Sequence, residues 1–196
     1  MEQSLKKRCK CLQMGVVKDD KESITNLLKN ALTSADIVVT TVGVSVGDYD
    51  FVKDVIKEDL QCEVLFQGVD IKPGQHILFA KKDEKFIIGL PGFAYSSTVT
   101  FLLYVLPLIY KLKGADEKLN IVEAICDENF PKKGNKTTFT ACNVEFKDGN
   151  YHIDFDGKKS GSSAILTNML ENCGLLFQEA DSDNISTGDR VKVILL

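Results

Sequence analysis

The sequence predicts an α/β domain with a mostly parallel sheet, followed by a small β-barrel-like domain. Up to about residue 113, short apolar runs rich in β-branched residues alternate with segments whose apolar residues recur at helical spacing. Beyond Lys113-Gly114 the chain becomes more polar and consists of short strand-like runs. Alternation of strands and helices is typical of a sheet covered by helices, whereas successive short strands are typical of a barrel. The expected domains are therefore residues 1–113 and 114–196.

The first domain begins with a predicted strand–helix–strand unit. A strand is expected around Cys11–Val17, and the acidic segment "KDDKES" after it suits the start of a helix. Apolar residues at helical spacing continue this helix through Ile24–Leu32, and the run Asp36–Thr40 forms a buried strand. Together these elements predict a right-handed crossover. The remaining elements are expected to be a helix at 51–60, strands at 62–66, 77–80 and 86–90, and an apolar helix at 99–112.

The second domain is predicted from shorter and more polar segments. Only residues 162–172 break the strand pattern, because Ile165, Met169 and Leu170 form a short helical stripe. This arrangement predicts a small barrel-like domain of about eighty residues. Its strands are expected at 120–125, 136–146, 151–155 and 188–196.

Composition and charge narrow the classes of partner. The 196 residues are 44% hydrophobic and 27% charged, with a net charge of −4. A mildly acidic chain has no electrostatic reason to bind nucleic acid or anionic lipid. The longest apolar stretch, Val99–Tyr110, contains Pro107 and is too short to span a bilayer, and the basic N-terminus lacks the apolar core of a signal peptide. We expect a cytoplasmic protein without membrane contact.

The cysteines do not form a recognisable metal motif within the chain. There are six cysteines and two histidines, and no CxxC pair. Cys9 and Cys11 are two residues apart, and the other four are scattered singly. The expectation is a set of reduced thiols, partly buried, rather than a structural zinc site.

Three segments end predicted strands and open predicted helices: "VVKDDKES", "TTVGVSVGDYD" and "LPGFAYSS". Ligands of an open α/β sheet bind beyond the C-terminal ends of its strands, where helix N-termini offer backbone N–H groups to anions. Glycines allow close approach of the backbone, and Asp19, Asp20, Asp48 and Asp50 add carboxylates. This combination suggests a phosphorylated substrate held with Mg²⁺.

Plainer interpretations of the same residues remain open. Asp19 or Asp20 can be a helix N-cap, Gly43 and Gly47 can serve turn geometry alone, and Pro91-Gly92 can simply end a strand. Other enzyme classes have less support. The chain has no P-loop pattern, no dinucleotide fingerprint and no GxSxG elbow for a serine hydrolase.

Several segments, in order, resemble the molybdopterin molybdenumtransferases, a family that includes the gephyrin E-domain. They are "ADIVVTTVGVSVGDYDFVKDVI", "VLFQGVDIKPGQHILFA" and "IIGLPGFAYSSTVTFLLYVLPLIYKL". "GSSAILTNMLENCGLL" and "TGDRVKVILL" extend the resemblance over the C-terminal part. The resemblance implies a three-layer molybdopterin-binding-like domain and a C-terminal β-barrel domain. It also implies the last step of molybdenum cofactor synthesis, in which molybdate is inserted into adenylylated molybdopterin and AMP is released.

The resemblance assigns roles to residues in the matched motifs. Asp19 and Asp50 fall on functional aspartates, and they are expected to be catalytic and to bind the divalent cation, Mg²⁺. The expected substrate-binding residues are Gly43, Ser45, Gly47, Asp48, Lys72, Pro91 and Gly92.

The chain also departs from the family pattern. Val42-Gly43 replaces paired glycines, "LPGFA" replaces "LPGNP", and "KPGQH" replaces "KPGKP". The family's first strand, with its "STGDEL" motif, has no counterpart, so the chain corresponds to the C-terminal half of such an enzyme and its site is expected to be incomplete. The alternative function is a non-catalytic molybdopterin-binding or interaction module. Expected partners are the small-molecule substrates, a second copy of the chain, or other proteins of molybdenum cofactor synthesis.

Overall fold

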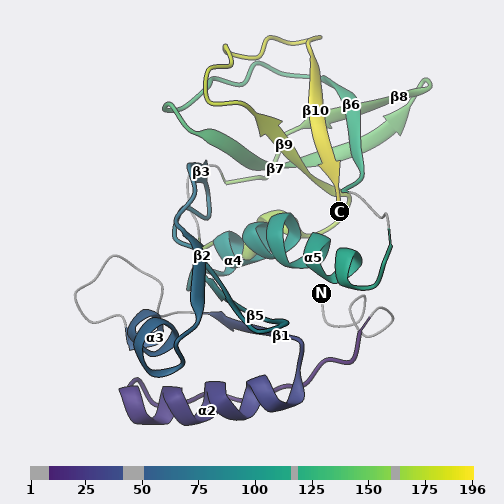
Figure 1. The fold of residues 1–196 in the computed structure, drawn as a ribbon. Helices are drawn as coiled ribbons and strands as arrows, with labels where there is room; N and C mark the ends of the chain where they lie inside the picture. Colours follow the sequence, from purple (N-terminus) through teal and green to yellow (C-terminus); the bar gives the residue numbers. More distant parts are fainter. Residues whose placement is uncertain (1–8, 42–50, 116–118, 160–163) are drawn as a thin grey trace. The chain divides into compact units, whose positions relative to one another are not determined.

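The computed structural model describes residues 9–41, 51–115, 119–159 and 164–196 (Figure 1). Its contacts divide the chain into two compact units, Met1–Gly68 with His76–Gly92, and Val69–Gln75 with Phe93–Leu196. The second unit therefore contains the long apolar helical run as well as the barrel strands. The domain boundary expected near residue 113 stays a prediction.

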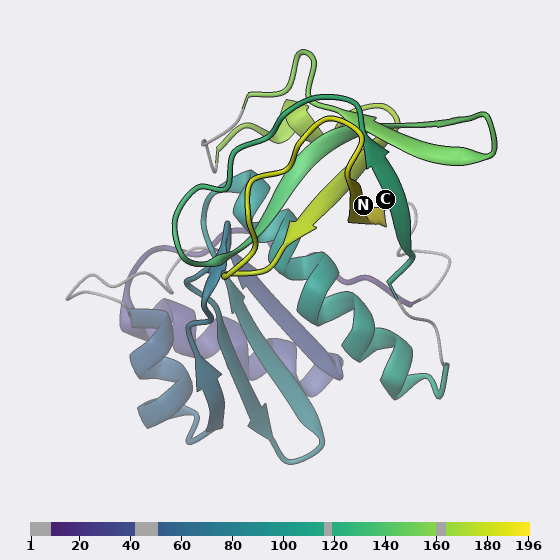
Figure 2. The same ribbon diagram turned by 90° about the horizontal axis from the view of Figure 1, so that it is seen from above.

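The first unit is built on a four-stranded sheet in the order β1 (Ile37–Thr41), β5 (Lys85–Leu90), β4 (Leu78–Lys82) and β2 (Glu63–Gln67). Figure 2 shows this sheet from its face. β1 pairs with β5 in parallel, whereas β4 is antiparallel to both β5 and β2. The α/β class is confirmed, but the described part of the sheet is mixed rather than mostly parallel. The reason is that β4 and β5 are joined by a tight hairpin, which can connect only antiparallel strands.

Two helical segments cover this sheet. α2 (Lys21–Ser34) is amphipathic, and it contacts both β1 and the helical segment formed by α3 (Phe51–Asp54) and the π-helix η1 (Val55–Asp59) (Figure 1). The Lys85 ammonium group donates a hydrogen bond to the Leu32 carbonyl in the last turn of α2, where a cation is favourable. The buried residues of this core come from both helical segments, from three of the strands and from the link between η1 and β2: Ile24, Leu28, Ala31, Val38, Val52, Val55, Ile56, Leu60, Cys62, Leu78, Ala80 and Ile87.

The strand expected around Cys11–Val17 is not formed. Residues 9–18 carry no regular secondary structure, and no described strand pairs with them. Leu12, Met14 and Val16 are exposed, while Val17 packs against the helical core. An extended segment becomes a strand only when a neighbour satisfies its backbone groups, and the sequence pattern alone could not show that none does so here.

The second unit contains a closed five-stranded barrel, as expected. Its strands follow the order β7, β8, β6, β10 and β9, and the pairing of β9 with β7 closes the ring, with the short strand β3 (Ile71–Lys72) attached in parallel to β7. Leu176 and Val193 are fully buried inside it. The barrel strands are β6 (Ile121–Cys126), β7 (Thr137–Lys147), β8 (Asn150–Asp154), β9 (Cys173–Gln178) and β10 (Arg190–Leu195).

A continuous apolar helical run completes the second unit. It consists of α4 (Ala94–Thr100), the π-helix η2 (Phe101–Val105) and α5 (Leu106–Leu112). Among the described residues, this run has the length and composition of a membrane span. Val99, Val105 and Ile109 within it are buried inside the protein, as in a core helix.

Tyr95 links this helix to the barrel through hydrogen bonds. Its hydroxyl donates a hydrogen bond to the Phe139 carbonyl at 2.9 Å and accepts one from the Ala141 amide at 2.8 Å, both on β7. The side chain is 6% exposed, and burial raises the pKa of Tyr95 above its usual range. The hydroxyl therefore satisfies the hydrogen bonding of two backbone groups of β7, as a neighbouring strand would.

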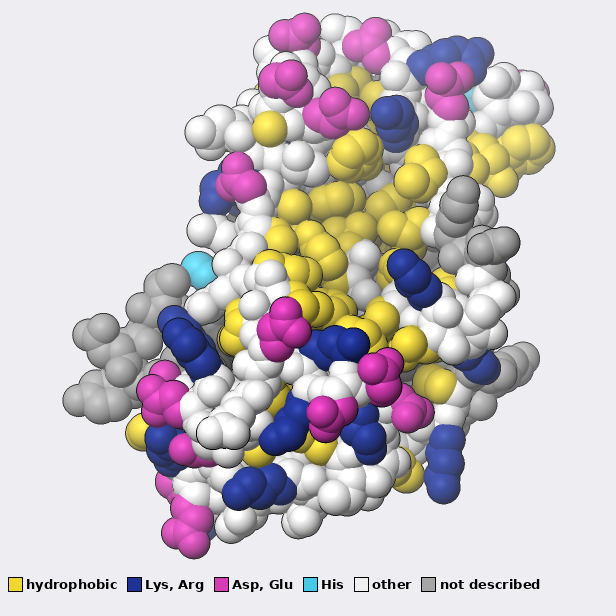
Figure 3. All heavy atoms as spheres, viewed as in Figure 1, with side chains coloured by type: hydrophobic (Ala, Val, Ile, Leu, Met, Phe, Trp, Pro, Cys, Tyr) yellow, Lys and Arg dark blue, Asp and Glu magenta, His cyan; other side chains and the backbone are white. Residues whose placement is uncertain are grey.

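The face shown in Figure 3 carries charged side chains of both signs as well as a broad area of hydrophobic side chains. Lysine and arginine side chains alternate there with aspartate and glutamate. That face therefore offers no extended basic surface of the kind that nucleic acid requires.

Candidate functional site

The two aspartates at the start of α2 have different roles. Asp20 is the N-cap, since its carboxylate accepts hydrogen bonds from the Ser23 amide and the Ser23 hydroxyl, both at 2.8 Å. The amide hydrogen bond is the main cause that lowers the pKa of Asp20. Asp19 is exposed and has no hydrogen-bond or ion-pair partner in the described part of the chain. Capping therefore accounts for Asp20 and leaves the carboxylate of Asp19 available to a ligand.

Replacing Asp20 with alanine is expected to lower the Tm at neutral pH, with a smaller difference in acid. The pKa of Asp20 is lowered in the folded protein from its ordinary value of 3.8. Its contribution is therefore present above the unfolded pKa and is lost as the pH falls through the folded pKa. Thermal unfolding of both proteins from neutral to strongly acidic pH tests this. Asp20→Asn, which keeps a capping oxygen, should retain more stability than Asp20→Ala; equal losses at every pH would contradict the assignment.

Two of the predicted ligand segments start from adjacent strand ends. β1 and β5 are parallel, and Thr41 is in register with Leu90, so the C-terminal ends of the two strands lie side by side at one edge of the sheet. Pro91 is buried and Gly92 is exposed at the end of β5. α2 leads directly into the start of β1, so its N-terminus with Asp19 lies toward the same edge (Figure 1). The other predicted residues of this site, Gly43, Ser45, Gly47, Asp48 and Asp50, lie outside the described residues.

One further polar group lies near this edge of the sheet. Thr40, near the end of β1, has a buried hydroxyl oxygen with no hydrogen-bond partner among the described residues. Buried hydroxyl groups are normally paired, so an unpaired one beside a predicted ligand loop is a candidate contact.

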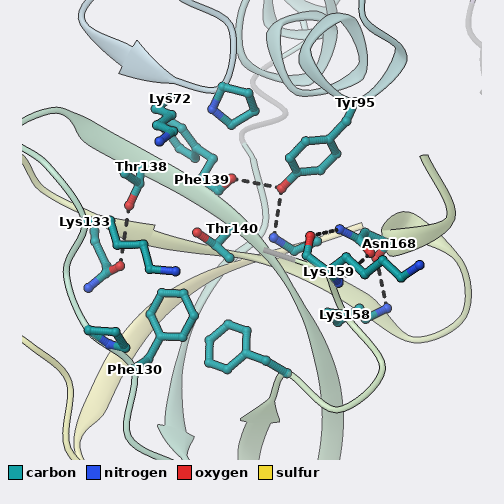
Figure 4. A pocket seen from close by; sticks show the side chains of 15 residues that line it. Lys72, Tyr95, Phe130, Lys133, Thr138, Phe139, Thr140, Lys158, Lys159 and Asn168 are labelled. Carbon is teal, nitrogen blue, oxygen red and sulfur yellow. Dashed lines mark hydrogen bonds between the residues drawn. The ribbon is translucent and has the colours of Figure 1, made fainter. Parts of the chain in front are cut away.

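A second candidate site lies wholly within the second unit. It is a cavity of about 90 Å³ lined by four lysines, Lys72, Lys133, Lys158 and Lys159, and by no acidic residue among those that the structure describes (Figure 4). Lys72 was predicted to bind substrate. The structure places it in this unit, whereas Pro91 and Gly92 belong to the first. The cavity is well below the roughly 300 Å³ of a typical pocket for an organic ligand, so it suits a small ion.

Asn168 positions two of these lysines. Its side-chain amide donates a hydrogen bond to the Lys159 carbonyl at 2.7 Å and accepts one from the Lys159 amide at 3.0 Å. The Lys158 ammonium group donates to the carbonyls of Asn168 at 2.9 Å and of Leu170 at 3.3 Å (Figure 4). Asn168 is 7% exposed; the bond from Lys158 to Leu170 is exposed, and the other three are partly buried. The segment carrying both cations is therefore held against the cavity.

Gln178, at the end of β9, supplies a buried donor to the same cavity. The side chain is 4% exposed, and its carbonyl oxygen lies 3.5 Å from the Thr138 hydroxyl. Its Nε2 amino group has no hydrogen-bond partner in the described part of the structure. An unpaired buried donor in a cavity that lysines line favours a ligand that accepts hydrogen bonds and carries negative charge.

Apolar side chains form another wall of the cavity. Phe130 and Phe155 stack with their ring centroids 4.1 Å apart, and both line it. An apolar wall lowers the local dielectric constant and strengthens the attraction between an anion and the lysines. The sequence did not single out Lys133, Lys158, Lys159 or Gln178. The available signal was the placement of two lysine pairs beside glycines, in "KKG" and "GKK".

Comparison with known proteins divides the chain into two matched regions. Residues 2–111 match the family model described as "Probable molybdopterin binding domain". Residues 123–196 match the model described as "MoeA C-terminal region (domain IV)". The first match alone covers more than half of the 196 residues.

Relatives with curated names agree with both matches. The chain is 30% identical to molybdopterin molybdenumtransferase of Haemophilus influenzae over 96% of its own length and 46% of that protein. It is 32% identical to the Staphylococcus aureus protein of the same name over 94% of its own length and 44% of that protein. The chain thus spans less than half the length of these relatives.

Solved structures with the same fold come from two Pyrococcus species. A molybdenum cofactor biosynthesis protein from Pyrococcus furiosus aligns with a TM-score of 0.74 and 22% identity, over 100% of this chain and 62% of that one. The molybdopterin biosynthesis MoeA protein of Pyrococcus horikoshii aligns with a TM-score of 0.70 and 25% identity, over 93% and 42% of the two chains. The chain belongs to the molybdopterin molybdenumtransferase family, matching the C-terminal part of its members.

Proposed function

We propose that this chain acts in the insertion of molybdate into adenylylated molybdopterin, with release of AMP. The observation that carries the proposal is the cavity with four lysines and the buried Gln178 donor, in a chain of this family. Molybdate is a small dianion that accepts hydrogen bonds, and it is the substrate of the reaction that gives the curated relatives their name. The size, charge and hydrogen-bonding capacity of the cavity suit such an ion.

Each candidate site has its own ligand in the proposal. In the proposal, the cavity holds molybdate, with the lysines offsetting its charge and Gln178 donating a hydrogen bond. The edge where β1 and β5 end receives the phosphate groups of adenylylated molybdopterin. Gly43, Ser45, Gly47 and Asp48 contribute there through the loop after β1, and Pro91-Gly92 through the turn after β5.

Magnesium belongs to the proposal only through Asp19 and Asp50. Of these, Asp19 is an exposed carboxylate without a partner among the described residues, and Asp50 lies outside them. The described residues contain no group of three or more potential metal ligands. One carboxylate is too few to fix a cation, so no step is assigned to magnesium.

Lys72→Ala is expected to weaken molybdate binding about 10- to 100-fold, the effect of losing a charged hydrogen bond worth about 1.5–3 kcal/mol. Lys57→Ala, an exposed lysine of the first unit, should leave binding unchanged and serves as the control. Isothermal titration with molybdate measures the affinity of each protein. Release of AMP from adenylylated molybdopterin, followed with and without molybdate and magnesium, measures the reaction. If Lys72→Ala and wild type bind molybdate with equal affinity, the cavity is not the molybdate site.

One observation favours the alternative, a non-catalytic molybdopterin-binding or interaction module. Phe93 occupies the N-cap of α4, where it makes no capping hydrogen bond and is 63% exposed. An apolar side chain at this helix start does not satisfy backbone N–H groups as a polar cap does. Molybdate and pterin binding without any release of AMP would favour this module over the enzyme.

A further inference from the structure

Three neighbouring strands place a row of polar side chains along the lysine cavity. Thr138 on β7 is in register with Lys72 on β3 and with Gln178 on β9. Residues directly opposite each other on neighbouring strands share one face of the sheet, so the three side chains lie side by side. All three line the cavity. Backbone pairing on both sides of Thr138 therefore fixes the row.

Thr138 determines which end of the Gln178 amide is available to a ligand. Its hydroxyl group donates a hydrogen bond to Oε1 of Gln178 at 3.5 Å (Figure 4). Both side chains are buried, at 8% and 4% exposed. Oε1 is thus engaged, while Nε2 has no hydrogen-bond partner among the described residues. Gln178 therefore offers the cavity a donor and not an acceptor.

The other side-chain oxygens of the described lining offer little to a ligand that must donate a hydrogen bond. Oδ1 of Asn168 accepts from the Lys159 amide at 3.0 Å, and the Tyr95 hydroxyl accepts from the Ala141 amide at 2.8 Å. Thr140 contributes a neutral hydroxyl, and hydrogen bonds to neutral groups are about half as strong as those to a carboxylate. The lining residues that the structure describes include no carboxylate. The lysines add only donors.

We propose that Gln178, oriented by Thr138, makes the cavity selective for oxyanions that carry no proton. Molybdate and sulfate are fully ionised at neutral pH, so every oxygen atom of these ions can accept a hydrogen bond. Phosphate keeps at least one proton at this pH, and its O–H group needs an acceptor. A phosphate ion in the cavity would leave that group poorly paired, which lowers its affinity. The inference rests on the proposed function, because it names the class of anion that the molybdate site accepts.

Isothermal titration of the full chain with molybdate, sulfate and phosphate at neutral pH tests the proposal. Wild type should bind phosphate about 10-fold more weakly than molybdate, the effect of one poorly paired polar group. Sulfate should also bind more tightly than phosphate. Gln178→Glu introduces a carboxylate of nearly the same shape, which accepts the phosphate proton and repels unprotonated ions. This variant should therefore prefer phosphate to molybdate.

Thr138→Val isolates the effect of the hydroxyl group, and it introduces no charge into the cavity. Without this hydroxyl, the Gln178 amide can rotate and present Oε1 to the ligand, so phosphate should gain affinity relative to molybdate. Thr140→Val is the matched control on the same strand, because Thr140 makes no hydrogen bond to Gln178. It should keep at least the selectivity of wild type. Thermal unfolding of each variant shows that it is folded.

Other outcomes overturn the proposal. If wild type binds molybdate and phosphate with equal affinity, the inference fails while the molybdate site stands. The same holds if Gln178→Glu and Thr138→Val keep the selectivity of wild type. Sulfate that binds as weakly as phosphate would show that the size of the anion, and not its proton, decides. If none of the three ions binds, the proposed function fails together with this inference.

Discussion

Gly74→Ala is expected to destabilise the second unit by about 2–6 kcal/mol, the sum of backbone strain and overpacking. Gly74 has a φ of +107°, a conformation that residues with a side chain rarely adopt. An added Cβ would lie 2.4 Å from Cγ2 of Thr100, a distance that requires one of the two to move. Because Gly74 follows Lys72-Pro73 beside the cavity, the same change should also weaken molybdate binding.

Two control variants distinguish the backbone strain at Gly74 from the steric clash with Thr100. Gly149 has a φ of +77°, and nothing lies within 4 Å of an added Cβ there, so Gly149→Ala carries strain alone and should cost less. Thr100→Ser removes Cγ2 but keeps the hydroxyl that donates a hydrogen bond to the Ser96 carbonyl at 2.9 Å. The double variant Gly74→Ala with Thr100→Ser should recover part of the loss. Denaturant unfolding gives the free energy of unfolding of wild type, Gly74→Ala, Gly149→Ala and the double variant. Equal losses in Gly74→Ala and Gly149→Ala would rule out a steric clash with Thr100.

Leu176→Ala should destabilise the barrel by about 2–5 kcal/mol, because it leaves a cavity where the surrounding strands cannot collapse. Leu176 on β9 is 0% exposed, and it belongs to a core cluster with Ile153 and Val193 from two other strands. Differential scanning calorimetry should show a large fall in the Tm. Leu170→Ala removes the same atoms from a side chain that is 60% exposed, so it should change the Tm little. A similar fall for both would mean that Leu176 is not in the barrel core.

Hydrophobic periodicity predicted most elements, and it was least informative where a segment is buried on all sides. The helix that became α2 has one apolar face and one polar face, so its spacing alone identified it. β9 was missed because "CGLLFQ" is a continuous apolar run, which is compatible with either a helix or a strand. Residues 162–172 were read as a helical stripe, and the described part of that segment contains only the short 3-10 helix Leu166–Met169.

Parts of the candidate site formed by residues close together in the sequence could be predicted. Parts that bring distant residues together could not. Strand ends followed by helix starts were visible in the sequence, as was the capping alternative that Asp20 fulfils. The lysine cavity brings together Lys72, Lys133 and Lys158, which are far apart in the chain. Their proximity follows from closure of the barrel and from the pairing of β3 with β7, and neither leaves a local pattern.

The hydroxyl of Tyr95 limits where this chain can be divided. The family match that contains α4 ends at residue 111 and the barrel match begins at residue 123, so a cut between them looks natural. Such a cut would take away the acceptor of the Ala141 amide and the donor to the Phe139 carbonyl. A barrel fragment prepared in this way would expose two unpaired backbone groups on β7, and its Ala141 amide would exchange rapidly with solvent. A fragment that begins before Phe93 would keep them paired.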